Sequence, residues 1–151
     1  MMTADQIATI RSTWNLMGAT TDAVAPLFYD RLFQRDPLLR ALFTSTDMPA
    51  QGEKLAQTLA VVVRGLDHLD QLMPAVQALG RRHATYGVQD AHYDLVGAAL
   101  LDTFADILGD AFTADARSAW ATAYGALATV MQQAAASANA HATTHAAISA
   151  P

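Results

Sequence analysis

The stretch "RRHATYGVQDAHYDLVGAAL", residues 81–100, decides the fold that we predict for this chain. His83 lies near the end of a segment with helical apolar spacing, and Gly87 suits the left-handed conformation that ends many helices. Asp90 then opens a longer segment, in which apolar residues recur every three or four positions until Gly109. The sequence therefore predicts one helix, a tight break and a second, longer helix.

Helical spacing continues on both sides of this stretch, and no segment shows the alternation of a half-buried strand. Pro26 falls four residues after Asp22, so the second helix is expected to start irregularly or to bend. Residues 44–52 are expected to form a loop or a single turn, and residues 50–67 a helix. The other expected helix starts are Thr3 with Gln6 as a capping box, Asp22, Asp36 followed by Pro37, Pro74 and Thr113. We predict an all-α fold of about seven helices, two of them short.

The expected organisation is one globular domain over residues 1–136 and an Ala-rich tail over residues 137–151. A chain of 151 residues, 52% of them hydrophobic, is long enough to bury one sizeable core. The tail lacks an apolar stripe, so we expect the last helix to fray into it and the tail to be flexible. His141 and His145 in this tail have the spacing of a helical metal pair, but a solvated tail is the favoured interpretation.

Composition excludes several classes of function. A net charge of −5 argues against the basic surface that binds nucleic acid or an anionic membrane. Because there are no cysteines, disulfides, thiolate metal sites and thiol catalysis are excluded. The phosphate loop, the dinucleotide fingerprint, the nucleophile elbow and the HExxH motif are all missing. With no signal peptide and no apolar span, the expected location is the cytoplasm.

The remaining chemistry lies with the histidines. His83 and His92 are nine residues apart, which on one helix is about 900° of rotation and places them on opposite faces. At most one of them is therefore a metal ligand. His83 shares an apolar stripe with Val76, Leu79 and Gly80, which suits a flat apolar cofactor with a metal centre better than a zinc ion needing three further ligands. A core histidine bonded to a backbone carbonyl is the alternative that spacing alone favours.

Two polar residues upstream stand on otherwise apolar faces. Gln51 begins the face that continues with Leu55, 32 residues before His83, far enough for this helix to cross over and face the histidine. Tyr29 brings a hydroxyl among phenylalanines and leucines. Each alone is typical of the edge of a core. Together they would offer an amide and a phenol to one cavity, where buried donors need an acceptor.

Three segments carry a resemblance to a known family: "LFYDRLFQRDPLLRALF" at 27–43, "GRRHATYGV" at 80–88 and "AHYDLVGAALLDTFADILGDAFTADARSAWATAYG" at 91–125. The chain resembles bacterial single-domain globins, which are relatives of the globin half of flavohaemoglobins, and neuroglobin-like bacterial globins. The resemblance covers about residues 4–133. It implies a globin fold, a 3-over-3 sandwich of helices, with haem b as cofactor.

The resemblance also implies roles for individual residues. His83 matches the proximal ligand of the haem iron, with its second ring nitrogen donating to the Leu79 carbonyl. Phe43 matches the phenylalanine that wedges against the haem. The resemblance implies that three residues lie on the distal side of the haem, where a gas ligand binds: Tyr29, Gln51 and Leu55. The other implied haem contacts are Val88 and Tyr93 in the pocket, His92 near the haem edge, and Lys54 and Arg82 as partners of the haem propionates.

One departure from the family pattern bears on function. Flavohaemoglobin-type globins place a glutamate in the last helix, bonded to the proximal imidazole, and the matching position here is about Ala135. The only glutamate of the chain is Glu53, and no flavin-binding or NAD-binding segment is seen.

The resemblance therefore implies reversible binding of dioxygen, with carbon monoxide and nitric oxide as further gas ligands. The alternative function is that of a nitric oxide dioxygenase, which would work with a separate reductase. A globin fold without haem, as in a sensor module or an open-chain tetrapyrrole binder, is the third possibility. The expected assembly is a monomer or a weak homodimer.

Overall fold

The structure is a computed structural model that describes residues 2–18 and 21–149, with side chains of residues 2–18 and 22–137. Within these ranges every regular element is a helix, which confirms the all-α prediction. The elements are α1 (Ala4–Leu16), α2 (Thr21–Arg35), α3 (Met48–Arg64), α4 (Leu69–Thr85), α5 (Asp90–Leu108) and α6 (Ala114–Ser149), with the 3₁₀ helices η2 (Pro37–Phe43), η3 (Leu66–His68) and η4 (Gly109–Ala111).

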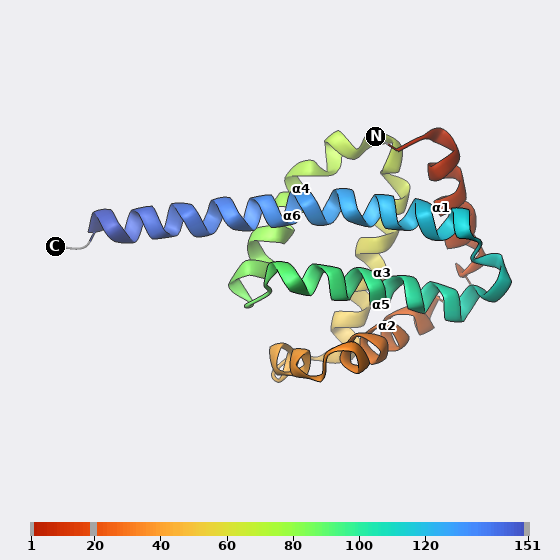
Figure 1. Cartoon of the computed structure of the whole chain (residues 1–151), viewed down its shortest axis with the longest axis horizontal. Helices are drawn as coiled ribbons and strands as arrows, with labels where there is room; N and C mark the ends of the chain where they lie inside the picture. Colours follow the sequence, from red (N-terminus) through yellow and green to blue (C-terminus); the bar gives the residue numbers. More distant parts are fainter. Residues whose placement is uncertain (1, 19–20, 150–151) are drawn as a thin grey trace.

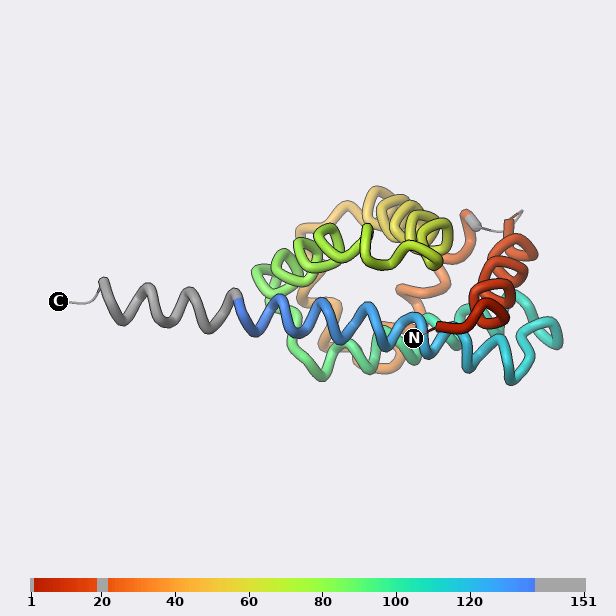
Figure 2. Tube along the Cα trace, turned by 90° about the horizontal axis from the view of Figure 1, so that it is seen from above, coloured from red at the N-terminus to blue at the C-terminus, as the bar shows by residue number. Residues whose placement is uncertain are grey.

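The helices form two layers (Figures 1 and 2). The helices α5 and α6 run side by side in opposite directions, and α3 and α4 cross them in the other layer. The main helix contacts are those of α4 and α1 with α6, of α2 with α5 and α3, and of α5 with α6. The helix α4 packs on α6 at Gly80, and the start of α3 packs on α2 at Gly52.

The core joins α1, α5 and α6 through Trp120. Its indole nitrogen donates to the Thr13 hydroxyl at 2.8 Å, and its ring centre lies 4.5 Å from that of Phe104, which is fully buried. The Thr13 hydroxyl in turn donates to the carbonyl of Thr9. The polar groups of this core are therefore satisfied.

Several predicted helix ends are confirmed. The side chains of Thr3 and Gln6 form the capping box, and the Asp36 carboxylate accepts from the Leu38 amide before η2. Thr113 caps α6 by accepting from the Ala116 amide at 3.1 Å. The breaks at Gly87 and Gly109 have φ angles of 89° and 55°, which glycine adopts without the strain of a side chain.

Other predicted boundaries are wrong. The helix α4 begins at Leu69, so Pro74 lies inside it, where it deletes one backbone hydrogen bond near the start. The helix α3 begins at Met48 with Asp47 as its cap and ends at Arg64, so residues 44–52 are only partly a loop. The helices α2 and α5 begin at Thr21 and Asp90, which places the expected caps Asp22 and Asp90 inside the first turn.

The backbone of α6 continues as a helix to Ser149. The boundary after residue 136 and the flexible tail stay predictions. The pair His141 and His145 lies outside the described side chains. In the part of the chain that the structure describes, none of the helices combines the length and the apolar character needed to span a bilayer.

Candidate functional site

His83 lies in the last turn of α4 and is half-buried. Its Nδ1 lies 2.8 Å from the Leu79 carbonyl oxygen, to which it donates as predicted. Burial lowers the pKa of His83, the Leu79 hydrogen bond partly opposes this, and the charge of Arg82 lowers the pKa further. The imidazole is therefore neutral at pH 7. With the proton on Nδ1, the lone pair of Nε2 is the one available to a metal.

The turn that follows fixes the main chain of this histidine. The Val88 amide donates to the His83 carbonyl at 3.1 Å, and the Gly87 amide donates to the Ala84 carbonyl at 3.1 Å. These two bonds form a Schellman motif, which requires a left-handed residue at Gly87. The backbone and the ring of His83 are thus held independently of each other.

On the other side of the predicted site, Tyr29 of α2 is buried, with 8% of its surface exposed. Its ring centre lies 5.0 Å from that of Phe28 and 5.5 Å from that of Phe43, which belongs to η2. Burial raises the pKa of the Tyr29 phenol, and a hydrogen bond with the Gln51 side chain partly lowers it. The phenol therefore keeps its proton at neutral pH and can donate it.

A close helix crossing brings Gln51 beside Tyr29. Gly52 of α3 packs on Ala25 of α2 so closely that a Cβ at Gly52 would lie 3.0 Å from that of Ala25. Because Gln51 precedes Gly52, its amide reaches the phenol. Leu55 lies one turn further along α3 and is partly buried against the core, whereas Lys54 is exposed.

The predicted residues of α5 divide into two kinds. Tyr93 is buried, with 6% exposed, and its hydroxyl has no hydrogen-bond partner among the described residues. His92 instead accepts from the Gln89 amide through Nδ1 at 2.9 Å, so this nitrogen stabilises the start of α5. Val88 is half-buried and Arg82 is exposed.

Tyr29 therefore contacts both Gln51 and Phe43. His83 is held by its hydrogen bond to the Leu79 carbonyl. The turn after α4 meets η2 at Leu42, whose Cδ2 would lie 3.5 Å from a Cβ at Gly87. Sequence reasoning missed the role of Gly80. A Cβ there would lie 2.6 Å from the Cα of Met131, so α4 and α6 touch backbone to backbone one turn before His83.

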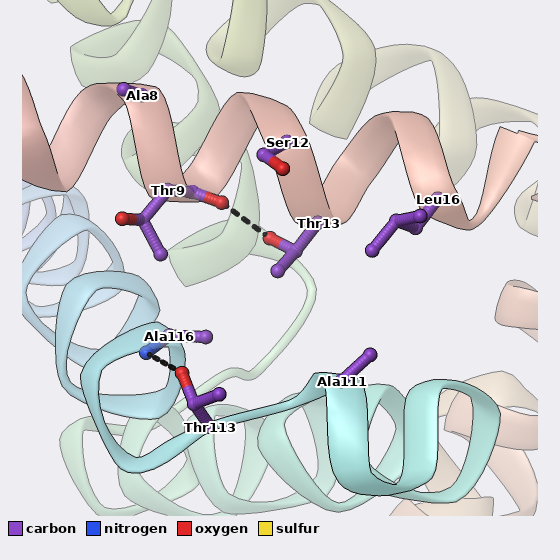
Figure 3. A pocket seen from close by; sticks show the side chains of 8 residues that line it. All are labelled: Ala8, Thr9, Ser12, Thr13, Leu16, Ala111, Thr113 and Ala116. Carbon is purple, nitrogen blue, oxygen red and sulfur yellow. Dashed lines mark hydrogen bonds between the residues drawn. The ribbon is translucent and has the colours of Figure 1, made fainter.

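Two surface hollows lie apart from this site. One, of about 390 Å³, separates α1 from the start of α6, and Figure 3 shows that hydroxyl side chains line much of it. Three of these four hydroxyls are engaged, since Thr9 bonds to Asp5, Thr13 to Thr9 and Thr113 to Ala116. The other, of about 420 Å³, runs between α5 and α6 and includes Tyr93. Neither hollow includes His83 or Gln51.

The side chains of this site suit a metal ion held by a macrocyclic cofactor better than they suit a bare metal ion. Among the described residues, no three histidines or carboxylates gather as a bare metal ion would require. A neutral imidazole on a half-buried face provides one axial nitrogen, and the tyrosine with no partner is a polar group left for a ligand or cofactor to satisfy. Haem needs such an axial nitrogen and otherwise apolar surroundings.

Known proteins with similar sequences include flavohemoproteins. A flavohemoprotein of Bacillus subtilis (strain 168) is 34% identical over 130 residues, which are 85% of this chain and 33% of that protein. A flavohemoprotein of Vibrio cholerae is 33% identical over 132 residues, which are 86% of this chain and 34% of that protein. This chain spans about a third of the length of these relatives.

A solved structure is similar over almost the whole chain. It is an engineered carbene transferase from a candidate nitric oxide dioxygenase of Rhodothermus marinus, with a TM-score of 0.84 and 28% identity, over 95% of this chain and 99% of that one. The family model for globins matches residues 27–131. The chain belongs to the globin family, and its two-layered arrangement of helices is the globin fold.

Proposed function

We propose that this chain holds haem b through His83 and reversibly binds dioxygen on the opposite side, where Tyr29 and Gln51 meet. The observation that carries the proposal is a neutral imidazole oriented by Leu79, together with a buried phenol paired to an amide. Haem would supply an iron centre that binds a diatomic gas. The chain itself supplies the axial nitrogen, the apolar surroundings and the hydrogen-bond donors.

The apolar part of the site belongs to Phe43 and Leu55. Phe43 packs edge-on against Tyr29 and Phe33, with ring centres 5.5 Å away from each, so its ring is fixed in place. Leu55 is partly buried one turn beyond Gln51. In the proposed site these two side chains exclude water, which strengthens every hydrogen bond made there. We assign the remaining cofactor contacts to Val88 and Tyr93, and the propionate contacts to Lys54 and Arg82.

The distal pair would determine how long the gas stays bound. The Tyr29 phenol and the Gln51 amide bond to each other, so each has a partner to exchange for a ligand. Dioxygen held at a ferrous haem would be polarised and would accept hydrogen bonds well, whereas carbon monoxide would be less polarised and would accept them poorly. Each donor in a dry pocket is worth about 1–3 kcal/mol, or roughly tenfold to a hundredfold in affinity.

The test is stopped-flow dissociation of dioxygen from Tyr29→Phe and Gln51→Leu. We expect each change to speed dissociation by about tenfold to a hundredfold, with a smaller effect on carbon monoxide. Gln57→Leu is the matched control, because Gln57 is an exposed glutamine of the same helix. Unchanged dioxygen dissociation in both site variants would rule out the distal roles.

Conversion of nitric oxide to nitrate with a separate reductase is the second candidate. The observation in its favour is that the similar solved structure is described as a candidate nitric oxide dioxygenase. Against it stand Ala134 and Ala135, which are buried in α6 where the family pattern has a glutamate. Without a carboxylate on the proximal imidazole, the ligand is a weaker electron donor. Nitric oxide turnover with a supplied reductase distinguishes the two candidates.

A further inference from the structure

The end of α4 exposes one aromatic ring beside His83. Tyr86 follows the last residue of α4 and is 62% exposed, and its ring centre lies 6.3 Å from that of His83. Its amide donates to the carbonyls of Arg82 and His83, so the turn that holds the histidine also holds this tyrosine. Among the described residues, no other tyrosine, tryptophan or phenylalanine is exposed. Tyr86 therefore links the surroundings of His83 to the solvent.

The three other tyrosines differ from Tyr86 in where a proton can go. A phenol that loses one electron becomes a strong acid, so its oxidation is easy only where the proton can leave. Tyr93 is buried, and its hydroxyl has no partner among the described residues. Tyr29 bonds to the side-chain amide of Gln51 and Tyr124 to a backbone carbonyl, and neither of these groups is a base. Among the four tyrosines, only Tyr86 can release its proton to water, which avoids a buried charge.

The two tryptophans, which are also oxidisable, lie far from this turn. Trp14 belongs to α1 and Trp120 lies near the start of α6, with their ring centres 6.3 Å apart. Figure 1 shows α1 and the start of α6 at the opposite end of the molecule from the end of α4. Trp120 is also buried, with its N–H bonded to the Thr13 hydroxyl. Among these side chains, a ring neighbouring His83 and access to water combine only at Tyr86.

We propose that Tyr86 is the site at which this chain oxidises small phenols when a hydroperoxide reacts with its haem. The proposal rests on the proposed function, because the haem held by His83 is what the hydroperoxide oxidises. The hydroperoxide gains two electrons and two protons, its O–O bond breaks, and an alcohol and a water molecule leave. One electron comes from the haem. Tyr86 gives the other by way of the neighbouring His83 ring, and its phenolic proton goes to water.

A small phenol then restores Tyr86 by giving it a hydrogen atom. The O–H bond of the phenol breaks, and the O–H bond of Tyr86 forms again. A second phenol returns the other electron by the same route, and its proton goes to water. Each hydroperoxide therefore oxidises two phenols. Because Tyr86 is exposed, a phenol needs no access to the interior where Tyr29 and Gln51 meet.

The identity of the oxidised residue is tested by trapping it. The ferric haem protein is treated with hydrogen peroxide and a nitrone spin trap without any phenol, and peptide mass spectrometry locates the adduct. We expect the adduct on Tyr86 and its loss in Tyr86→Phe. Tyr86→Trp should carry the adduct at the same position, because it keeps an exposed oxidisable ring beside His83.

Leu16 provides a matched control for exposure. It is 62% exposed, as Tyr86 is, and it is the last residue of α1, at the other end of the molecule. The double variant Tyr86→Phe/Leu16→Tyr therefore keeps an exposed tyrosine but places it away from His83. We expect this variant to show no adduct and to oxidise the phenol guaiacol as slowly as Tyr86→Phe does. The Soret band should respond to hydrogen peroxide at the same rate in every variant.

Four results would overturn the assignment of Tyr86. They are an adduct on another side chain in place of Tyr86, no adduct although the Soret band responds to hydrogen peroxide, guaiacol oxidation that is unchanged in Tyr86→Phe, and full recovery in the double variant. Haem content and dioxygen dissociation do not depend on Tyr86 and report separately on the proposed function. Failure of the proposed function and failure of the oxidation site are therefore distinguishable.

Discussion

At the scale of the residue, two separate sets of bonds hold His83. The carbonyl of Leu79 fixes the ring, and the Schellman closure at Gly87 fixes the main chain. The sequence singled out the residue types of the candidate site, because a histidine, a phenol and an amide are unusual on apolar faces. It could not predict that His92 would cap a helix or that the Tyr93 hydroxyl would lack a partner, because these depend on side-chain direction.

The lowered pKa of His83 predicts how the haem-free protein responds to acid. In the unfolded chain the imidazole gains a proton near its ordinary pKa of 6.5, whereas the folded state binds that proton only at lower pH. The contribution of His83 to stability is therefore complete above pH 6.5 and is lost as the pH falls. Urea unfolding across this range should show a shallower pH slope for His83→Gln, and equal slopes in the two proteins would contradict the assignment.

At the scale of the element, the contact between α4 and α6 positions His83. A methyl group at Gly80 would overlap the backbone of Met131, which cannot move aside as a side chain can. Gly80→Ala should therefore separate the two helices, lower the free energy of unfolding and weaken haem binding, although alanine favours helix by about 1 kcal/mol. Haem titration and thermal unfolding measure both effects.

Gly125→Ala is the control, because a Cβ at Gly125 of α6 meets nothing within 4 Å. It should leave haem binding unchanged and raise stability by up to about 1 kcal/mol. If Gly80→Ala proved as stable as Gly125→Ala, the backbone contact would not be what positions His83.

The predicted helix boundaries are correct where a side chain caps the helix. Thr3, Asp36 and Thr113 bond to backbone amides as predicted. The predicted helix start at Pro74 is wrong because a proline near the start of a helix deletes only one backbone hydrogen bond. Packing of the helix offsets the loss of that bond. Here Leu72 of the same helix packs on Gly65, so α4 forms upstream of the proline.

At the scale of the whole molecule, buried and half-buried tyrosines link neighbouring helices. Tyr124 of α6 donates to the Tyr93 carbonyl of α5 at 2.7 Å, and Tyr29 joins α2 to α3. The all-α class and the family were readable from periodicity and motifs. The sequence suggested that Tyr29 and Gln51 face one cavity, but not that they contact each other, because that contact depends on how closely α2 and α3 cross at Gly52.

Alkaline pH should weaken the fold. Burial raises the pKa values of Tyr29, Tyr93 and Tyr124 above the ordinary 10.0. The folded state keeps these phenols neutral while the unfolded chain ionises them, so stability is complete below pH 10 and decreases as the pH rises above it. Urea unfolding at increasing pH should show this loss, with a shallower slope in Tyr124→Phe. A stability that stays flat to about pH 11 would refute it.

The central claim is that one imidazole, His83, holds the haem of this globin. The most direct measurement compares haem content and ultraviolet–visible spectra of the purified protein and of His83→Ala, in the ferric, ferrous and carbonyl forms. We predict one haem for each unaltered chain, and for His83→Ala a loss of haem or a changed Soret band. A His83→Ala protein with a full complement of haem and the unaltered spectra would contradict the claim.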